Sequence, residues 1–142
     1  MTFVSLTRLR VRSMRFLPGF LWNTFRVVRQ VKQAAGFRTG ALLKDRQWTF
    51  WTMTAWDSQE SMRQFMTSDA HKKTMPYLLN WCDEASAAHW EQTDDALPAW
   101  MQADQRMRNS GRPSKVYNPS PQHASLTSRT PRTTASVPIQ RS

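Results

Sequence analysis

The sequence predicts an α+β domain of the ferredoxin-like type, in which a four-stranded antiparallel sheet carries helices on one face in the order βαββαβ. Two observations lead to this fold class. The hydrophobic pattern of residues 3–92 switches between a two-residue period and a three- to four-residue period in that order. The run RQWTFWTMTAW at residues 46–56 has large apolar side chains at both odd and even positions, so both faces of that strand need a cover.

The first two elements are a strand and a long helix. Residues 3–12 (FVSLTRLRVR) follow a rough two-residue alternation, which predicts a strand whose Arg-bearing end is exposed. A helix is expected from Leu17 to Gly36, with Pro18 in its first turn and Gly36 at its C-terminal cap. Its apolar stripe consists of Leu17, Phe20, Leu21, Phe25, Val28 and Val31.

A hairpin, two helical pieces and a last strand follow. Residues 36–45 are expected to pair with residues 46–56 as an antiparallel hairpin. Asp57 or Ser58 caps the next helix, and a further helix from about residue 69 has an apolar stripe that reaches Cys82. Pro76 should bend or interrupt that helix, and residues 84–92 (EASAAHWEQ) form the fourth strand. The third helical piece thus leads directly back to the sheet.

The two apolar faces of residues 46–56 also predict an oligomeric state. The expected helices cover only one face of the sheet, so the other face needs a further apolar surface. A second copy of the chain would supply it if the two sheets faced each other. We therefore expect a homodimer.

The formal net charge of +10 is unevenly distributed. Ten Lys or Arg and one acidic residue lie in residues 1–47, three and nine in residues 48–104, and seven and none in residues 105–142. Such basic segments suit nucleic acid or an anionic membrane, but they also serve solubility. No nucleic-acid motif accompanies them, so nucleic acid is not an expected partner.

The composition changes beyond about Trp100. Five of the eight Pro lie in residues 105–142, among Ser, Thr, Arg and Gln, with few apolar residues to bury. We expect a folded domain over residues 1–100 and a basic, disordered tail over residues 101–142.

The cysteine content and the N-terminus indicate a cytoplasmic protein. The single cysteine, Cys82, excludes an internal disulfide and a Cys-based metal cluster. The apolar run Phe16–Trp22 contains Pro18 and Gly19 and is far shorter than the roughly 20 residues that span a bilayer. We therefore expect no targeting or transmembrane segment.

The segments TFWTMTAWDSQESMRQFMTSDAH (49–71) and MPYLLNWCDEASAAHWE (75–91), in a βαββαβ order, resemble the antibiotic biosynthesis monooxygenase-like group of dimeric α+β barrels. The Arg-rich RFLPGF (15–20) before a long helix resembles uncharacterised proteins related to spheroidene monooxygenase within that group. The resemblance covers about residues 2–100 and implies a dimer with a pocket between sheet and helices in each subunit. Its members include monooxygenases that oxidise aromatic polyketides without metal or flavin, haem-degrading enzymes and proteins without known activity, so the fold does not name the reaction.

One departure from that group concerns haem. The haem-degrading members combine a helix Trp with a His about ten residues later that ligates iron. Phe65 and Met75 stand at these positions here, with His71 between them. A thioether is a poor replacement for imidazole in that role, so no cofactor or metal is expected, and haem is kept as an alternative.

The candidate site consists of one His and a set of aromatic and apolar residues. His71 is the candidate general base or hydrogen-bonding group, since imidazole titrates near neutral pH; the alternative is a surface or capping role. His89 and Trp90 are neighbours in a strand, so only one of them can face the pocket. The predicted substrate-binding residues are Trp22, Trp51, Trp56, Phe65, Met75, Trp81 and His89, with the core or the dimer interface as the alternative for the aromatic ones.

Two functions are consistent with these residues. The first is a small monooxygenase-like protein that binds, and as an enzyme oxidises, an apolar aromatic or polyene molecule between sheet and helices without a bound metal. The second is a non-catalytic ligand-binding or membrane-surface protein, whose basic amphipathic helix Met14–Lys32 and tail contact anionic lipid.

Overall fold

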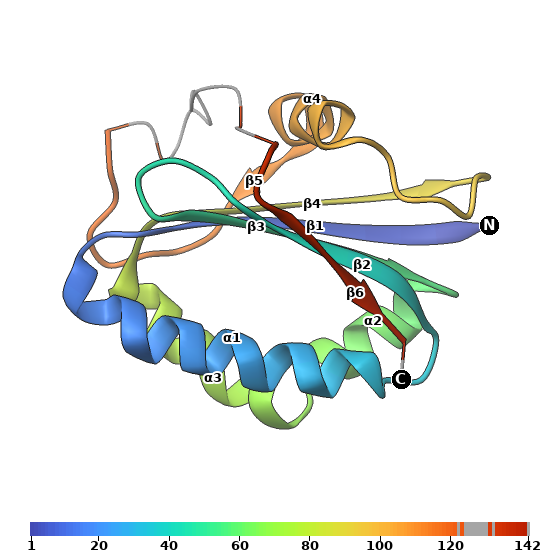
Figure 1. Cartoon of the computed structure of the whole chain (residues 1–142), viewed down its shortest axis with the longest axis horizontal. Helices are drawn as coiled ribbons and strands as arrows, with labels where there is room; N and C mark the ends of the chain where they lie inside the picture. The colour runs from blue at the N-terminus through green and yellow to red at the C-terminus, as the bar shows by residue number, and fades with distance from the viewer. Residues whose placement is uncertain (122, 124–130, 132, 142) are drawn as a thin grey trace.

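The structure is a computed structural model that describes residues 1–121, 123, 131 and 133–141. A single twisted sheet forms the middle layer, with α1, α2 and α3 on one face and α4 on the other (Figure 1). The strands are β1 (Thr2–Val11), β2 (Phe37–Lys44), β3 (Thr49–Trp56), β4 (Cys82–Gln92), β5 (Arg112–Pro113) and β6 (Ser136–Gln140). The helices are η1 (Met14–Phe16), α1 (Leu17–Lys32), α2 (Gln59–Met66), α3 (Asp69–Trp81) and α4 (Trp100–Ser110).

The sheet has six strands in the order β5-β4-β1-β3-β2-β6, and all its pairs are antiparallel. The predicted α+β class and the βαββαβ order of the four central strands are confirmed. The predicted number of four strands is wrong, because β5 and β6 extend both edges. Both come from the C-terminal region and are short, so neither produces the alternation by which a strand is recognised in a sequence.

Strict alternation along the strands gives the sheet two different apolar faces. On β1, Val4 and Leu6 belong to the cluster under α4, whereas Phe3 belongs to a cluster on the side of α1 and α2. On β3, Trp51 faces α4 and Trp56 faces the other helices. The strand with two apolar faces is therefore a central strand between two helical layers.

Helix α4 covers the face that the sequence analysis assigned to a second copy of the chain. Its buried residues Ala103 and Met107, together with Leu97 and Trp100, pack on a cluster that includes Trp51. The folded part of the chain thus continues past the predicted boundary at residue 100, because residues 97, 100, 103 and 107 form a short apolar stripe with helical spacing. The homodimer stays a prediction, but the two faces of β3 no longer require it.

The described part of the predicted tail also lies against the sheet. The backbone N–H groups of Ser114, Tyr117 and Ser120 donate to carbonyl oxygens of Ala85, Leu79 and Asp83, respectively, at 2.7, 2.8 and 2.9 Å. At the opposite edge β6 pairs with β2 and buries Ile139. The part of the tail prediction that concerns residues 122, 124–130, 132 and 142 lies outside the described residues.

The connections between elements agree in part with the prediction. Ser58 caps α2 as expected, with its hydroxyl oxygen accepting from the Ser61 N–H at 3.2 Å. Helix α1 ends at Lys32, and Gly36 lies in the following turn at φ +83°, where an added Cβ would be 2.4 Å from the Ser61 hydroxyl oxygen. The predicted helical stripe through Cys82 is wrong at its end, because Cys82 starts β4.

Among the described residues, no helix has both the length and the apolar character needed to cross a bilayer.

Candidate functional site

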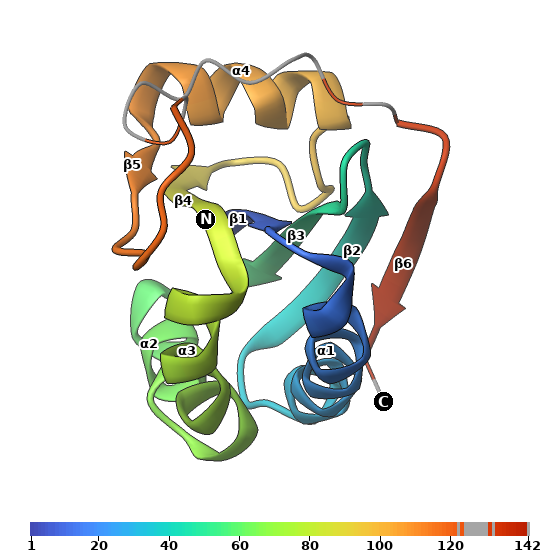
Figure 2. The ribbon, with the colours of Figure 1, turned by 90° about the vertical axis from the view of Figure 1, so that its left-hand side faces the viewer.

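A cavity of about 570 Å³ lies between the sheet and the layer formed by α1, α2 and α3. Its roof consists of residues from β1 to β4, and its floor consists of residues from the three helices. Figure 2 looks along this layer, with α1 on one side and α2 and α3 on the other. The volume falls in the range of small-molecule sites, which is roughly 300–1,000 Å³.

The cavity wall is mostly apolar, with a few polar groups that already have partners. Thr54 accepts a hydrogen bond from Trp56 Nε1 at 2.9 Å, and both residues line the cavity. Thr74 on α3 donates to Asn23 Oδ1 on α1 at 3.2 Å, which ties the two helices together. Such a wall favours an apolar ligand, because it offers few hydrogen-bonding groups to water or to a polar ligand.

His71 is held in the first turn of α3 with one ring nitrogen left for a ligand. Its backbone N–H donates to Gln30 Oε1 at 3.0 Å, and its ring lies edge-on to Phe65 with centroids 5.0 Å apart. Nδ1 lies 3.1 Å from the carbonyl oxygen of Met66. Because a carbonyl oxygen only accepts, Nδ1 carries the proton in this contact, and Nε2 is the acceptor of the neutral ring.

The surroundings of His71 keep it neutral at pH 7. Burial lowers the pKa of His71 below the ordinary 6.5, and the hydrogen bond with the Met66 carbonyl opposes this only in part. The residue lines the cavity. Among the described residues Nε2 has no hydrogen-bond partner, so this neutral imidazole on an apolar wall can accept a proton from a bound molecule.

His89 lines the same cavity from β4, while its neighbour Trp90 packs under α4 on the other face of the sheet. His89 is paired across the strands with Ser5, and its ring centroid lies 5.7 Å from that of Phe3. Burial, and to a lesser extent the charge of Arg63, lower its pKa. The residue is partly accessible to solvent, although it also lines the cavity.

The other predicted site residues divide into two groups. Trp56, Phe65 and Met75 line the cavity, and the Trp56 and Phe65 rings are 5.3 Å apart. Trp22 and Trp81 are not among the lining residues.

Trp51 also borders the cavity, but its side chain belongs to the cluster under α4, and its Nε1 donates to Asp45 Oδ2 at 3.2 Å. The structure therefore brings together His71, His89 and three of the predicted apolar residues. It separates the rings of the other three Trp from them.

Several lining residues were not predicted from the sequence. Thr24 and Val27 extend the inner side of α1, and a helical stripe widened by one position on each side would have included Val27. Lys115, Val137 and Ile139 reach the cavity from the C-terminal region. No local pattern marks those three, because their position depends on pairing with distant strands.

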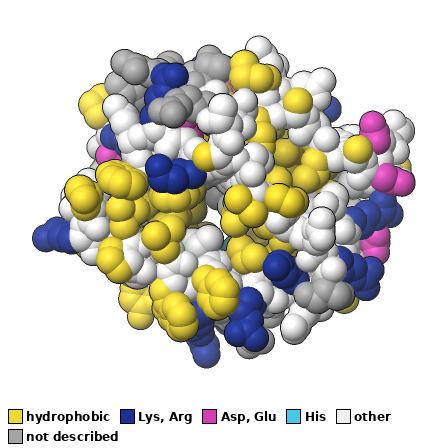
Figure 3. Space-filling model, viewed as in Figure 1, with side chains coloured by type: hydrophobic (Ala, Val, Ile, Leu, Met, Phe, Trp, Pro, Cys, Tyr) yellow, Lys and Arg dark blue, Asp and Glu magenta, His cyan; other side chains and the backbone are white. Residues whose placement is uncertain are grey.

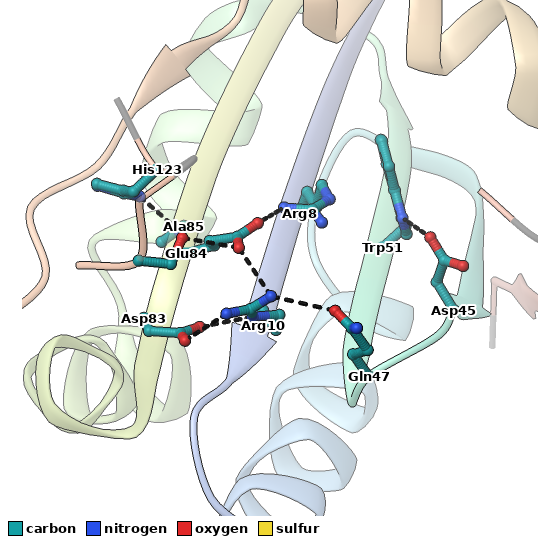
Figure 4. Close-up of polar contacts among 10 residues, drawn as sticks. Arg8, Arg10, Asp45, Gln47, Trp51, Asp83, Glu84, Ala85 and His123 are labelled. Atoms are coloured by element: carbon teal, nitrogen blue, oxygen red, sulfur yellow. Dashed lines mark hydrogen bonds and ion pairs between the residues drawn. The ribbon is translucent and has the colours of Figure 1, made fainter. Parts of the chain in front are cut away.

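The main buried polar cluster is drawn in Figure 4, and its charged side chains are not among those that line the cavity. Arg8 pairs with Glu84 at 2.6 Å, and Arg10 pairs with Asp83 at 2.6 Å and with Glu84 at 3.1 Å. The hydrogen bond to Asp83 is the main reason that the pKa of Arg10 is raised. The charges compensate one another across β1 and β4. Among the described residues, no group of three or more His, Cys, Asp or Glu side chains is placed to hold a metal ion.

A comparison with models of protein families shows the family to which this chain belongs. A model described as a domain of unknown function, DUF3291, matches residues 3–117. The chain belongs to the DUF3291 family. The DUF3291 match extends beyond β4 through α4 and β5, so the helix that covers the second face lies within the family's domain. No curated protein matches the chain.

Several solved structures have a fold similar to that of the DUF3291 chain. Rv0793 from Mycobacterium tuberculosis is 9% identical, with a TM-score of 0.61 over 68% of this chain and 100% of that one. A proposed antibiotic biosynthesis monooxygenase from Nitrosomonas europaea is 12% identical, with a TM-score of 0.58 over 65% and 90% of the two chains. SnoaB, a cofactor-independent oxygenase from Streptomyces nogalater, is 14% identical, with a TM-score of 0.55 over 68% and 97%.

At these identities the likeness concerns the fold alone. The predicted resemblance to the antibiotic biosynthesis monooxygenase-like group is confirmed at that level. The narrower resemblance of this DUF3291 chain to proteins related to spheroidene monooxygenase stays a prediction.

Proposed function

We propose that this protein binds an apolar aromatic or polyene molecule in the cavity under the sheet and oxidises it with molecular oxygen, without a bound metal. The observation that carries the proposal is His71, a neutral imidazole with a free Nε2 on the wall of a cavity of about 570 Å³. The similar fold of a cofactor-independent oxygenase supports this choice among cavity functions.

The reaction needs a substrate that can itself reduce oxygen. His71 Nε2 would take a proton from an acidic C–H or O–H group, and the resulting anion would transfer electrons to O₂. A new C–O bond then forms, and the peroxide loses water. A CH₂ group thereby becomes C=O, with one oxygen atom in the product and the other in water. The protein contributes orientation and the base.

The polar groups of the cavity wall would contribute little to holding such a molecule. Thr54 and Thr74 lie on opposite sides of the cavity, on β3 and α3, and both hydroxyls are already engaged with protein partners. A flat apolar substrate would therefore be held mainly by contacts with Trp56 and Phe65. The predicted resemblance to proteins related to spheroidene monooxygenase is the reason to include polyenes among the substrates to be tested.

The test uses a panel of polycyclic phenols, anthrones and polyenes. Binding is followed by quenching of Trp fluorescence, and turnover by oxygen consumption. His71→Gln should leave binding within a few-fold but lower turnover about 100- to 10,000-fold, the usual contribution of a general base. His89→Gln is the matched comparison and should lower turnover much less. Binding without turnover in the wild type would favour a non-catalytic ligand-binding protein, and equal turnover by His71→Gln would exclude His71 as the base.

A further inference from the structure

Five large hydrophobic side chains of α1 and α3 are exposed, and no described element covers them. They are between 41% and 61% exposed and form what we call the α1–α3 patch: Leu21, Trp22, Phe25, Met75 and Tyr77. In Figure 3 hydrophobic and basic side chains lie next to one another along the lower edge, where these helices run. A surface of this kind marks an interaction site, because isolated soluble domains rarely leave several large apolar side chains together in water.

Two residues of the patch also belong to the wall of the cavity. Leu21 and Met75 line the cavity and are also 50% and 41% exposed, so each belongs to the wall and to the outer surface. Trp22 and Phe25 continue the patch on α1 and stack on each other with centroids 6.0 Å apart.

The charge around the patch is positive. Arg15, Arg26 and Arg29 lie on η1 and α1, and no acidic residue occurs between Met14 and Lys32. Among the described residues, none of these three Arg side chains forms an ion pair. The Arg29 guanidinium lies 5.9 Å from the Phe25 ring centroid, so charge and apolar surface are presented together. On the other side, α3 adds the exposed pair Lys72 and Lys73.

We infer that the α1–α3 patch docks on the surface of an anionic lipid bilayer, which brings the part of the cavity wall formed by Leu21 and Met75 next to the lipid. Aromatic side chains are suited to the membrane interface, and basic side chains next to them bind anionic headgroups. Nucleic acid would match the Arg side chains but would leave Leu21 and Met75 exposed. A second copy of the chain docked through the same patch would bring two positively charged surfaces together, which like charges disfavour. The transfer of an apolar ligand from lipid to cavity rests on the proposed function, whereas the docking surface does not.

The first test is cosedimentation of the full chain with vesicles of phosphatidylcholine, with and without phosphatidylglycerol. We expect binding to the vesicles with phosphatidylglycerol, and weaker binding as salt rises. Arg26→Gln with Arg29→Gln should weaken binding about 25-fold, at about fivefold for each lost charge. The matched control is Arg46→Gln with Arg112→Gln, which removes the same charge from exposed positions outside α1 and α3 and should weaken binding much less. Equal losses in both pairs would overturn the assigned surface.

The second test removes the apolar part of the patch. Trp22→Ser with Phe25→Ser should abolish vesicle binding at low and high salt while the circular dichroism spectrum stays unchanged, since both side chains are exposed. Unchanged vesicle binding by this variant would overturn the inference. A dimer in solution that this variant converts to a monomer would also overturn it, because the patch would then be a contact between copies.

A cavity variant separates this inference from the proposed function. Thr52→Trp places a large ring in the cavity and leaves all five residues of the patch unchanged. This variant should lose binding of the polycyclic phenol, anthrone or polyene that the wild type binds, and it should keep vesicle binding. Loss of both properties would overturn the docking surface as a separate feature. Probe binding without vesicle binding in the wild type would overturn the docking inference and leave the proposed function standing.

Discussion

Arg8 and Glu84 form an ion pair of 2.6 Å between neighbouring strands β1 and β4, and their side chains are only 10% and 5% exposed. Glu84 also accepts from the Ser120 hydroxyl at 2.8 Å, so the same carboxylate joins the sheet to the C-terminal segment (Figure 4). Arg8 Nε has no hydrogen-bond partner among the described residues. The buried Arg8 therefore depends on Glu84 for its compensating charge.

Glu84→Gln should destabilise the fold strongly. Removal of one partner of a buried ion pair leaves the other charge uncompensated, which costs about 3–5 kcal/mol. Urea unfolding followed by Trp fluorescence measures the change in the free energy of unfolding. Asp83→Asn is the matched control and should cost less, because the Arg10–Asp83 pair is more exposed, at 22% and 17%. Equal stability of Glu84→Gln and the wild type would mean that water reaches this cluster.

The contact between α4 and the sheet can be measured with two Met residues of the same helix. Met107 is 3% exposed and packs in the cluster with Trp51, whereas Met101 is 49% exposed. Met107→Ala should cost about 2–5 kcal/mol of unfolding free energy, as is usual for a buried large-to-small change. Met101→Ala should cost close to nothing.

If both Met substitutions have the same small effect, α4 does not cover the sheet in solution. This face would then be available to a second copy of the chain, as the homodimer prediction requires, and light scattering would detect the dimer.

The sequence predicts the parts of the fold in which a local pattern decides the structure. The strand around Leu6 and the helix that carries Val31 each have a clear period, so their order and type follow. Helix α4 has few apolar residues among many polar ones, and its burial depends on the free face of a sheet formed by distant segments. The position of β6 depends likewise on the edge of β2, which no residue near Ile139 specifies.

The candidate site is predictable to a similar extent. Strand alternation places Trp56 on the cavity side of the sheet and Trp51 on the opposite side. The prediction of Trp51 as a substrate-binding residue did not take this alternation into account. Trp22 lies one position outside the inner stripe of α1, and this is enough to turn it to the surface. The free Nε2 of His71 depends on the Met66 carbonyl, a backbone contact that has no sequence signal.

The buried His71 should make the protein less stable in acid. Its pKa is lowered in the folded state, so the unfolded chain binds the proton more readily and stability falls as the pH drops below about 6.5. Above that pH both states are neutral and the effect is absent. His71→Gln should therefore reduce the loss of unfolding free energy between about pH 7.5 and about pH 5.5, as measured by urea titration. An unchanged loss would mean that other groups determine the acid sensitivity.

Cys82 should be unreactive in the folded protein. It is fully buried at the start of β4, and burial, with a smaller effect of Asp83, raises its pKa to about 12. At about pH 8 the thiolate is then rare, whereas an ordinary Cys with a pKa of about 8.5 is partly ionised. We expect a thiol reagent to modify it only after unfolding in urea, which absorbance of the released chromophore would show. Rapid modification of the native protein would mean that the β1–β4 end of the sheet opens.

The C-terminal strand should contribute to stability through one residue. Ile139 on β6 is 1% exposed and packs in the cluster with Phe37 and Trp56, whereas Val137 on the same strand is 60% exposed. Both residues line the cavity, so replacement of either by Ala enlarges the cavity in a similar way. The difference between the two variants therefore isolates the burial of Ile139.

Ile139→Ala should lower the free energy of unfolding by about 2–5 kcal/mol, and Val137→Ala should change it little. Urea unfolding at neutral pH measures both values. If β6 is dispensable, as a disordered tail would be, the two variants should be equally stable, and removal of residues 133–142 should leave the melting temperature unchanged. A clear loss in Ile139→Ala alone would mean that the chain closes its own cavity with its C-terminal strand, because the side chain that contributes the stability is also part of the cavity wall.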